Sequence, residues 1–228
     1  MDRLLALGEK GCLELMQAQL DALGSRAEVI CKKPVLALAS NNFGKLKELR
    51  EMLGERFDVR SMRELGISMD VEETGETFEE NALIKARALM AECHCATLAD
   101  DSGLCVDQLG GRPGVHSARY CGVHGDDEAN NQLLLKELSD KPEPHRAHYG
   151  AAVALCRPGR EDIVVYGRCE GQIIAEYRGT GGFGYDPLFL SDDLGVTFAE
   201  ASPEAKNGVS HRARAIRMVL DRLEAENG

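Results

Sequence analysis

The order in which strand-like and helix-like segments follow one another constrains the fold of this chain more than any other feature. Short apolar runs alternate with segments of helical spacing, and two strand-like runs then follow each other directly. These two runs, at 149–156 and 163–169, flank Arg157-Pro-Gly-Arg-Glu-Asp162, which is typical of a hairpin turn. Strands joined both through helices and by a hairpin predict a mixed sheet in an α/β protein.

The same spacing gives the expected elements and their bounds. Strands are expected at 35–39, 97–99, 149–156 and 163–169, and helices at 44–53, 77–91, 127–138 and 210–223. No repeat, low-complexity tract or linker interrupts the later chain, so residues 35–226 are predicted to form one domain. Residues 1–34 are predicted to be an N-terminal helical extension. Met1–Leu23 has apolar residues at mostly helical spacing, broken by charges that a signal peptide lacks.

Composition narrows the class of function. The chain has 228 residues, a formal net charge of -11 and no stretch dense in Lys or Arg, which argues against binding to nucleic acid or to anionic membranes. No apolar run reaches the ~20 residues that span a bilayer. Eight cysteines without a C-x-x-C pair indicate reduced thiols in a cytoplasmic protein. Cys93-His94-Cys95 and the histidines that follow fit no structural zinc pattern.

An apolar run at 96–99 leads directly into Asp100 and Asp101, which are followed by Ser102 and Gly103. A buried strand that ends there would deliver both carboxylates to the mouth of a cleft. Adjacent carboxylates repel each other, so a bound cation is an expected third component. An ordinary Asp-Ser-Gly turn is the alternative, and this segment alone does not separate the two.

A turn with the character of a phosphate site follows the first predicted strand. The run Ser40-Asn41-Asn42-Phe43-Gly44-Lys45 leads into a helix, where exposed N–H groups, a hydroxyl, an amide and a lysine suit a triphosphate. The spaced glycines and the Gly-Lys-Ser/Thr ending of a Walker A loop are missing. The alternative is an ordinary helix capped by Ser or Asn with solvated lysines, which the segment alone favours.

Five acidic residues lie between Glu72 and Glu80, at the start of the predicted helix 77–91. Thr77 followed three residues later by Glu80 is a capping-box pattern. A carboxylate in the first turn of a helix can instead point outward to bind Mg²⁺. Capping and metal binding compete for the Glu80 side chain, and both interpretations stay open.

Gly179–Pro187 is a glycine-rich loop that formally matches G-x-G-x-x-G. A strand-like Leu-Phe-Leu follows it where a dinucleotide-binding loop requires a helix, so that interpretation is rejected. What remains is a flexible loop that presents Phe183 and Tyr185 for stacking on a base.

The last segment of interest is Lys206–Arg214, at the start of the closing helix. Ser210 fits an N-cap, which sets His211 and Arg212 in the first helical turn. Cations are disfavoured at that end of a helix dipole, so an anion or a purine edge is expected opposite them. A solvated basic helix start is the alternative.

Five segments together resemble the inosine/xanthosine triphosphate pyrophosphatase family: SNNFGKLKEL, ETGETFEENALIKARA, ADDSGL followed by LGGRPGVHSARY, GGFGYDP, and SPEAKNGVSHRARA. Each is weak alone, but all five occur in the family's order over most of the chain, which makes the resemblance specific. It implies an elongated α/β fold in which a long mixed sheet, flanked by helices, splits into two lobes around a nucleotide cleft. It also implies a homodimer.

For function, the resemblance implies Mg²⁺-dependent hydrolysis of ITP, dITP, XTP and dXTP to the monophosphate and pyrophosphate, which clears deaminated purines from the precursor pool. It implies Asp101 as general base, and Glu80 and Asp101 as metal ligands. The substrate contacts that it implies are Ser40, Asn41, Asn42, Phe43, Gly44, Lys45, Ser102, Phe183, Gly184, Tyr185, Asp186, Lys206, His211 and Arg212.

Two other functions compete with this one. A related pyrophosphatase for a modified pyrimidine triphosphate would keep the phosphate and metal residues, but it should lose the Ser-His-Arg and Phe-Gly-Tyr-Asp elements, which are present here. A nucleotide-binding protein without turnover, docking partners through the N-terminal helix, would have no need of Asp101.

Overall fold

The computed structural model describes residues 15, 18 and 33–227. By its internal contacts the chain divides into two units, residues 1–34 and 35–228. In the first unit Leu15 and Ala18 are helical, and the rest of the predicted amphipathic helix lies outside the described residues. None of the helices in the described part of the chain has the length and apolar character needed to cross a bilayer.

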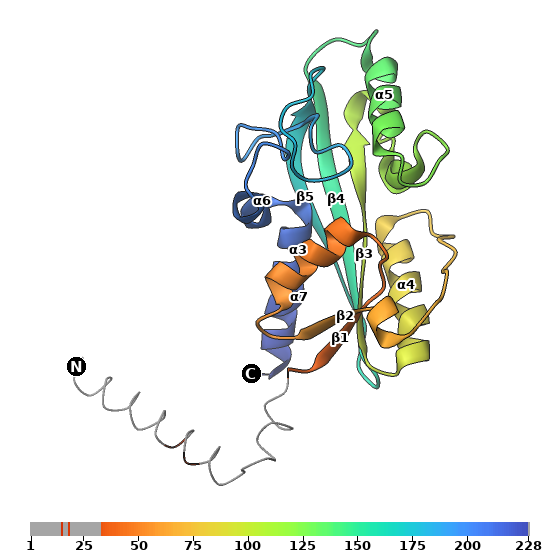
Figure 1. Ribbon diagram of the computed structural model, residues 1–228, viewed down its shortest axis with the longest axis vertical. Helices are drawn as coiled ribbons and strands as arrows, with labels where there is room; N and C mark the ends of the chain where they lie inside the picture. Colours follow the sequence, from red (N-terminus) through yellow and green to blue (C-terminus); the bar gives the residue numbers. More distant parts are fainter. Residues whose placement is uncertain (1–14, 16–17, 19–32, 228) are drawn as a thin grey trace, which may run out of the picture. The chain divides into compact units, whose positions relative to one another are not determined.

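The second unit is built on one mixed sheet with the strand order β2-β1-β3-β4-β5-β6 (Figure 1). β1 runs parallel to β2 and β3, whereas β3, β4, β5 and β6 are antiparallel in succession. This confirms the mixed sheet of an α/β protein. The strands are β1 (Val35–Leu38), β2 (Asp58–Ser61), β3 (Ala96–Val106), β4 (His145–Cys156), β5 (Ile163–Ile173) and β6 (Phe189–Ser191).

Four helices correspond to the four predicted ones: α3 (Phe43–Leu53), α4 (Phe78–Cys93), α5 (Asp127–Leu138) and α7 (His211–Asn227). The caps explain where they begin. The Asp126 side chain accepts the N–H of Ala129, and the Ser210 hydroxyl accepts the N–H of Ala213 at 3.2 Å. The predictions missed α6 (Pro203–Val209) and the 3₁₀ segments Arg63–Leu65, Asp107–Leu109 and Gly114–Arg119.

Helices cover both faces of the sheet, and Figure 1 shows α4 on one side of β3 with α3 and α7 on the other. Alternate residues of a strand point to opposite faces. Leu98 and Val153 therefore pack with α3 and α7, whereas Ala99 and Ala152 pack under α4. A third apolar cluster, around Leu104, lies farther along the strands and includes residues of α5.

The prediction that the strand ends at Ala99, with Asp100 and Asp101 leading into a Ser-Gly turn, is wrong. The strand continues to Val106, and β4 pairs with it throughout, with Asp100 opposite Val153 and Asp101 opposite Ala152. Both carboxylates are more than nine-tenths buried, because basic side chains from other elements satisfy them within the fold. The sequence around the pair gives no sign of those distant partners.

The other edge of β3 is open where the two aspartates lie. β1 pairs with β3 only from Ala96 to Leu98. Farther along, the backbone N–H of Leu104 donates to Ser117 Oγ at 2.9 Å, and that of Val106 donates to the Arg112 carbonyl at 3.1 Å. Between these two stretches the edge of β3 is left for side chains and ligands, which is where the functional site is built.

Candidate active site

A cavity of about 500 Å³ lies beside this open edge of β3. It brings together most of the predicted site residues: Ser40, Asn41, Asn42, Lys45, Asp101, Ser102, Phe183, Gly184, Tyr185, Asp186, Lys206, His211 and Arg212. It leaves out Phe43, Gly44 and Glu80. Its lining also contains charged residues to which the sequence reasoning gave no role, among them Glu73, Lys85 and Arg119.

The turn before α3 has the cap that the sequence suggested. Asn42 Oδ1 accepts the N–H of Lys45 at 3.0 Å, and Ser40 Oγ accepts the N–H of Asn42 at 3.2 Å. Phe43 is 85% exposed and does not line the cavity. At Gly44 a Cβ atom would lie 2.6 Å from the Phe183 ring, so glycine is what lets that ring pack across the start of α3.

The Lys45 side chain is not solvated, contrary to the ordinary-cap alternative. Its Nζ lies 2.5 Å from Asp100 Oδ1 and donates to the Asp100 carbonyl at 3.4 Å. Lys85 Nζ, from α4 on the other face of the sheet, donates to the same carbonyl at 3.2 Å. Two ammonium groups thus converge from opposite sides on the open edge of β3.

Asp100 and Asp101 point to opposite faces of the sheet, since they are neighbours in a strand. Asp100 faces α3 and α7. It receives Arg212 Nε at 3.1 Å and Ser102 Oγ at 3.1 Å, besides Lys45. Burial opposes its charge, but Arg212 and Lys45 outweigh burial and hold the pKa of Asp100 well below its usual range. Asp100 is therefore a fixed anion at neutral pH.

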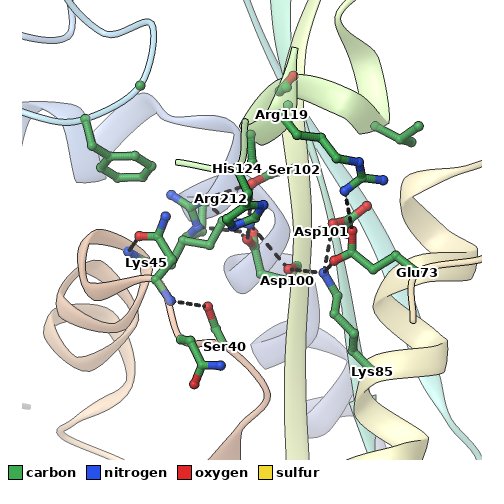
Figure 2. A pocket seen from close by; sticks show the side chains of 18 of the residues that line it. Ser40, Lys45, Glu73, Lys85, Asp100, Asp101, Ser102, Arg119, His124 and Arg212 are labelled. Carbon is green, nitrogen blue, oxygen red and sulfur yellow. Dashed lines mark hydrogen bonds and ion pairs between the residues drawn. The ribbon is translucent and has the colours of Figure 1, made fainter. Parts of the chain in front are cut away.

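Asp101 faces α4 and has a different environment (Figure 2). Its Oδ1 receives Lys85 Nζ at 2.8 Å, and its Oδ2 receives Asn81 Nδ2 at 3.3 Å. Burial raises the pKa of Asp101 above its usual value, although Lys85 acts in the opposite direction. Neighbouring carboxylates whose pKa values are pushed apart are a common basis for separate catalytic roles.

Lys85 also joins Asp101 to Glu73. Its Nζ lies 2.9 Å from Glu73 Oε1, while Arg119 Nη1 lies 3.3 Å from Glu73 Oε2 (Figure 2). Burial opposes the charge of Glu73, but Lys85 and Arg119 hold its pKa below the usual value. Two carboxylates and two cations therefore meet at this end of the cavity.

In the structure Glu80 caps the start of α4, as the capping-box alternative expected. Glu80 Oε2 accepts the N–H of Glu76 at 2.7 Å and that of Thr77 at 3.2 Å, and Thr77 Oγ1 accepts the N–H of Glu80. The Glu80 carboxylate is thus engaged with the backbone just before its own helix, and Glu80 does not line the cavity. The structure therefore brings Glu73 rather than Glu80 together with Asp101, and Glu76 and Glu79 do not line the cavity either.

The glycine loop at the other end of the cavity is anchored rather than free. Gly184 N–H donates to Asp127 Oδ2 at 2.8 Å, and Phe183 N–H donates to Asp186 Oδ2 at 2.9 Å. Tyr185 is 4% exposed, and its hydroxyl donates to the Ser117 carbonyl. Both rings line the cavity, and Phe183, which is half-buried, is the more exposed of the two.

Arg212, at the start of α7, and Lys206, in α6, both have anions opposite them, and those anions belong to the protein. Arg212 is 1% exposed and bonds to both Asp100 and Glu48. Lys206 Nζ lies 2.9 Å from Glu48 and 2.6 Å from Asp186. Glu48, one turn into α3, is thus the shared counterion of two predicted base contacts, which the sequence reasoning missed.

His211 is buried beside these cations. Its ring stacks on Tyr149 with centroids 4.8 Å apart, and its Nδ1 lies 3.8 Å from Cys169 Sγ. Burial, reinforced by Arg212, lowers the pKa of His211 well below its ordinary value. The imidazole is therefore neutral at pH 7 and presents one donor and one acceptor.

Comparison with known proteins finds one matching family. The model of the Ham1 family matches residues 36–222. The dITP/XTP pyrophosphatase of Bacillus subtilis (strain 168) is 46% identical over 199 residues, which is 86% of this chain and 100% of the relative. That of Bacillus licheniformis is 50% identical over 189 residues, 82% of this chain and 96% of the relative.

Solved structures give the same result. The Ham1 protein of Staphylococcus aureus has a TM-score of 0.75 at 40% identity, covering 84% of this chain and 98% of its own. The nucleoside-triphosphatase / dITP/XTP pyrophosphatase of Mycobacterium abscessus has a TM-score of 0.66 at 46% identity, covering 81% and 98%. The resemblance drawn from the five sequence segments is confirmed.

Proposed function

Because the chain belongs to the Ham1 family, we propose that it is a nucleoside-triphosphate pyrophosphatase that converts dITP, ITP, XTP and dXTP to the monophosphate and pyrophosphate. The observation that carries the proposal is the cavity at the open edge of β3, where Asp100 and Asp101 lie side by side in contrasting environments. Lys45, Lys85 and Arg119 line the same cavity and would offset the charge of a triphosphate.

The donor set fits Mg²⁺. Among the described residues no three His, Cys, Asp or Glu side chains form a ready-made metal cage. Mg²⁺, however, is usually bound by one or two carboxylates together with substrate phosphates. Asp101 and Glu73 both contact the single ammonium of Lys85, so two carboxylates already surround one cationic position. We assign the metal to Asp101 and Glu73, with Glu73 in the role expected of Glu80. When bound, Mg²⁺ supplies charge neutralisation and an acidified water.

The other steps of the reaction are assigned to residues of this chain. Asp101 accepts the proton of the water that attacks the α-phosphorus, and its raised pKa brings it closer to the operating pH that suits a general base. Lys45, Lys85 and Arg119 hold the phosphates in line and stabilise the departing pyrophosphate. Asp100 takes no proton, because Arg212 and Lys45 keep it ionised. It holds Lys45 and Ser102 in position beside the substrate.

Base selectivity is expected to come from Arg212 and its neighbours. Four N–H groups of Arg212 are engaged: Nε and Nη2 on Asp100, Nη1 on Glu48 and Nη2 on Ser102. A guanidinium has five, so one Nη1 N–H has no partner among the described residues. A carbonyl at the purine 6-position accepts such a donor, whereas the amino group of adenine leaves it unpaired. Sites built this way reject the wrong substrate by ~10⁴-fold or more.

The attack at the α-phosphorus is tested with dITP in oxygen-18 water and mass spectrometry of the products. The proposal predicts that the label enters the monophosphate and that pyrophosphate is unlabelled. Label in pyrophosphate or in free phosphate would place the attack at another phosphorus and contradict the assigned chemistry.

For the rest of the molecule, we propose a homodimer in the cytoplasm, with residues 35–226 as the catalytic domain and residues 1–34 as an extension that affects assembly. Sedimentation of the full chain and of a variant that lacks residues 1–33 is the test. Unchanged turnover with altered sedimentation supports the assignment, and lost turnover with unchanged sedimentation contradicts it.

A further inference from the structure

Asn81, in the first turns of α4, is a buried amide whose donor and acceptor groups are both hydrogen-bonded. It is 1% exposed. Its Nδ2 donates to Asp101 Oδ2 at 3.3 Å, and its Oδ1 accepts the backbone N–H of Gly75 at 2.8 Å. The reaction outlined above gives Asn81 no part, yet it touches the proposed general base directly.

The two partners fix the orientation of the amide. Reversing it would turn the amide nitrogen toward the N–H of Gly75 and the amide oxygen toward the Asp101 carboxylate. Both contacts would then be repulsive. Only one orientation satisfies both partners, so the amide N–H that faces Asp101 is held there by the bond at its other end.

Asn81 and Lys85 act on Asp101 as a pair. They are four residues apart in α4 and therefore lie on one face of the helix. Lys85 Nζ bonds to Oδ1 of Asp101 and Asn81 Nδ2 to Oδ2, so each carboxylate oxygen has its own donor from that face. Together they fix the rotation of the carboxylate as well as its position.

The other end of the amide holds the segment that carries Glu73. The backbone passes so close to α4 at Gly75 that an added Cβ would lie 2.7 Å from Asn81 Oδ1 and 2.7 Å from Glu80 Cβ. Glu73, two residues earlier, reaches Lys85 Nζ at 2.9 Å (Figure 2). One side chain thus bonds to Asp101 and to the backbone next to Glu73.

We propose that Asn81 is a positioning residue that holds the Asp101 carboxylate and the segment carrying Glu73 in a fixed position relative to each other. This inference rests on the proposed function for its catalytic consequence. Its donor holds the base in line with the attacking water, and its acceptor keeps the second carboxylate near the first. Residues that support reacting or metal-binding groups in this way are typically worth about 10–100-fold in activity or metal affinity.

Two variants separate the two bonds. Asn81→Asp keeps an oxygen acceptor for Gly75 but puts a second carboxylate oxygen against Asp101. Asn81→Leu removes donor and acceptor while keeping the same number and branching of heavy atoms. Asn130→Asp is the matched control, because Asn130 is a 2% exposed asparagine of α5 that caps the N–H of Cys121 at 2.8 Å and does not line the cavity. The measurements are kcat and KM for dITP, Mn²⁺ affinity by electron paramagnetic resonance without nucleotide, and hydrogen exchange at Gly75.

The inference predicts that both Asn81 variants lower kcat about 10–100-fold while KM changes less than about threefold, and that the control keeps kcat. Exchange at Gly75 should rise in Asn81→Leu only, and Mn²⁺ binding should weaken in that variant. An Asn81→Asp enzyme that keeps kcat within about threefold of wild type overturns the inference, even if Asn81→Leu is inactive. A wild type without turnover refutes the proposed function instead. Unchanged Gly75 exchange and Mn²⁺ affinity in Asn81→Leu would then still overturn the inference.

Discussion

Replacing Asp100 by asparagine is expected to destabilise the protein strongly, because it removes the anion that two buried cations share. The Asp100 side chain is 0% exposed and that of Arg212 is 1% exposed, with Nε and Oδ2 at 3.1 Å. Lys45 approaches from the other side at 2.5 Å. In the variant Arg212 keeps Glu48, but the local balance becomes one carboxylate against two cations.

Breaking a buried ion pair by removing one partner costs about 3–5 kcal/mol. For a chain of this length each kcal/mol lowers Tm by about 2–4 °C, so Asp100→Asn should unfold about 6–20 °C below wild type. The pKa of Asp100 is held low in the folded state, so its stabilising effect is complete above the unfolded-state value of about 4. The effect is lost as the pH falls, and the difference in Tm should narrow in acid.

Thermal unfolding followed by circular dichroism at pH 7 measures this difference. Asp192→Asn is the control, because Asp192 forms an ion pair with Arg146 at 2.6 Å but both side chains are more than two-fifths exposed. Exposed pairs are worth about 0–1 kcal/mol and weaken in salt. If Asp100→Asn loses no more stability than Asp192→Asn, the reasoning about the buried network is refuted.

Three further predictions follow from the site. Asp101→Asn should lower kcat about 10²–10⁴-fold if Asp101 is the general base, and steady-state turnover within about tenfold of wild type excludes that role. Glu73→Ala should raise the Mg²⁺ concentration needed for half-maximal turnover, whereas Glu80→Ala should mainly cost about 1 kcal/mol of helix capping. A Mg²⁺ titration and a melting curve of each variant check this, and the reverse pattern restores Glu80 as the ligand. Burial keeps the pKa of His211 well below its ordinary value in the folded protein. As the pH falls, His211 is therefore protonated in the unfolded chain before it is protonated in the folded one. Stability should then decline below about pH 6.5, by at most about 1.4 kcal/mol per pH unit, and His211→Gln should lose less stability over the same range in melting curves recorded from pH 5 to 8.

Local patterns in the sequence predicted the elements that local forces determine. Thr77 and Ser210 cap the helices where their spacing indicated, and the hairpin turn joins β4 to β5. β2 was missed because four residues are too few for a period-2 pattern to stand out, whereas β6 overlaps the strand-like Leu-Phe-Leu that follows the glycine loop. The continuation of β3 was missed because Asp100 is stabilised by Lys45 and Arg212, which are far away in sequence.

The sequence motifs predicted which segments form the site, but not which charged side chains contact one another. Five acids between Glu72 and Glu80 look alike in sequence, and only the fold turns Glu73 toward Lys85 while Glu80 caps α4. Asn81 and Lys85 follow that acidic segment and are four residues apart, so they lie on one face of the helix. This spacing was the local signal that both side chains could face Asp101. Glu48 offered no signal, because its partners Lys206 and Arg212 lie at the other end of the chain.

Pyrophosphate release from a panel of nucleotides measures the proposed activity itself. The full chain is given ITP, dITP, XTP, ATP, GTP and dTTP in turn, with Mg²⁺ and with EDTA. We expect metal-dependent release that is confined largely to the inosine and xanthosine nucleotides, because the cavity that contains Asp101 also contains Phe183 and Arg212, which are assigned to the base. Equal turnover of all six would contradict the base-recognition residues, and turnover of none would contradict the enzyme itself.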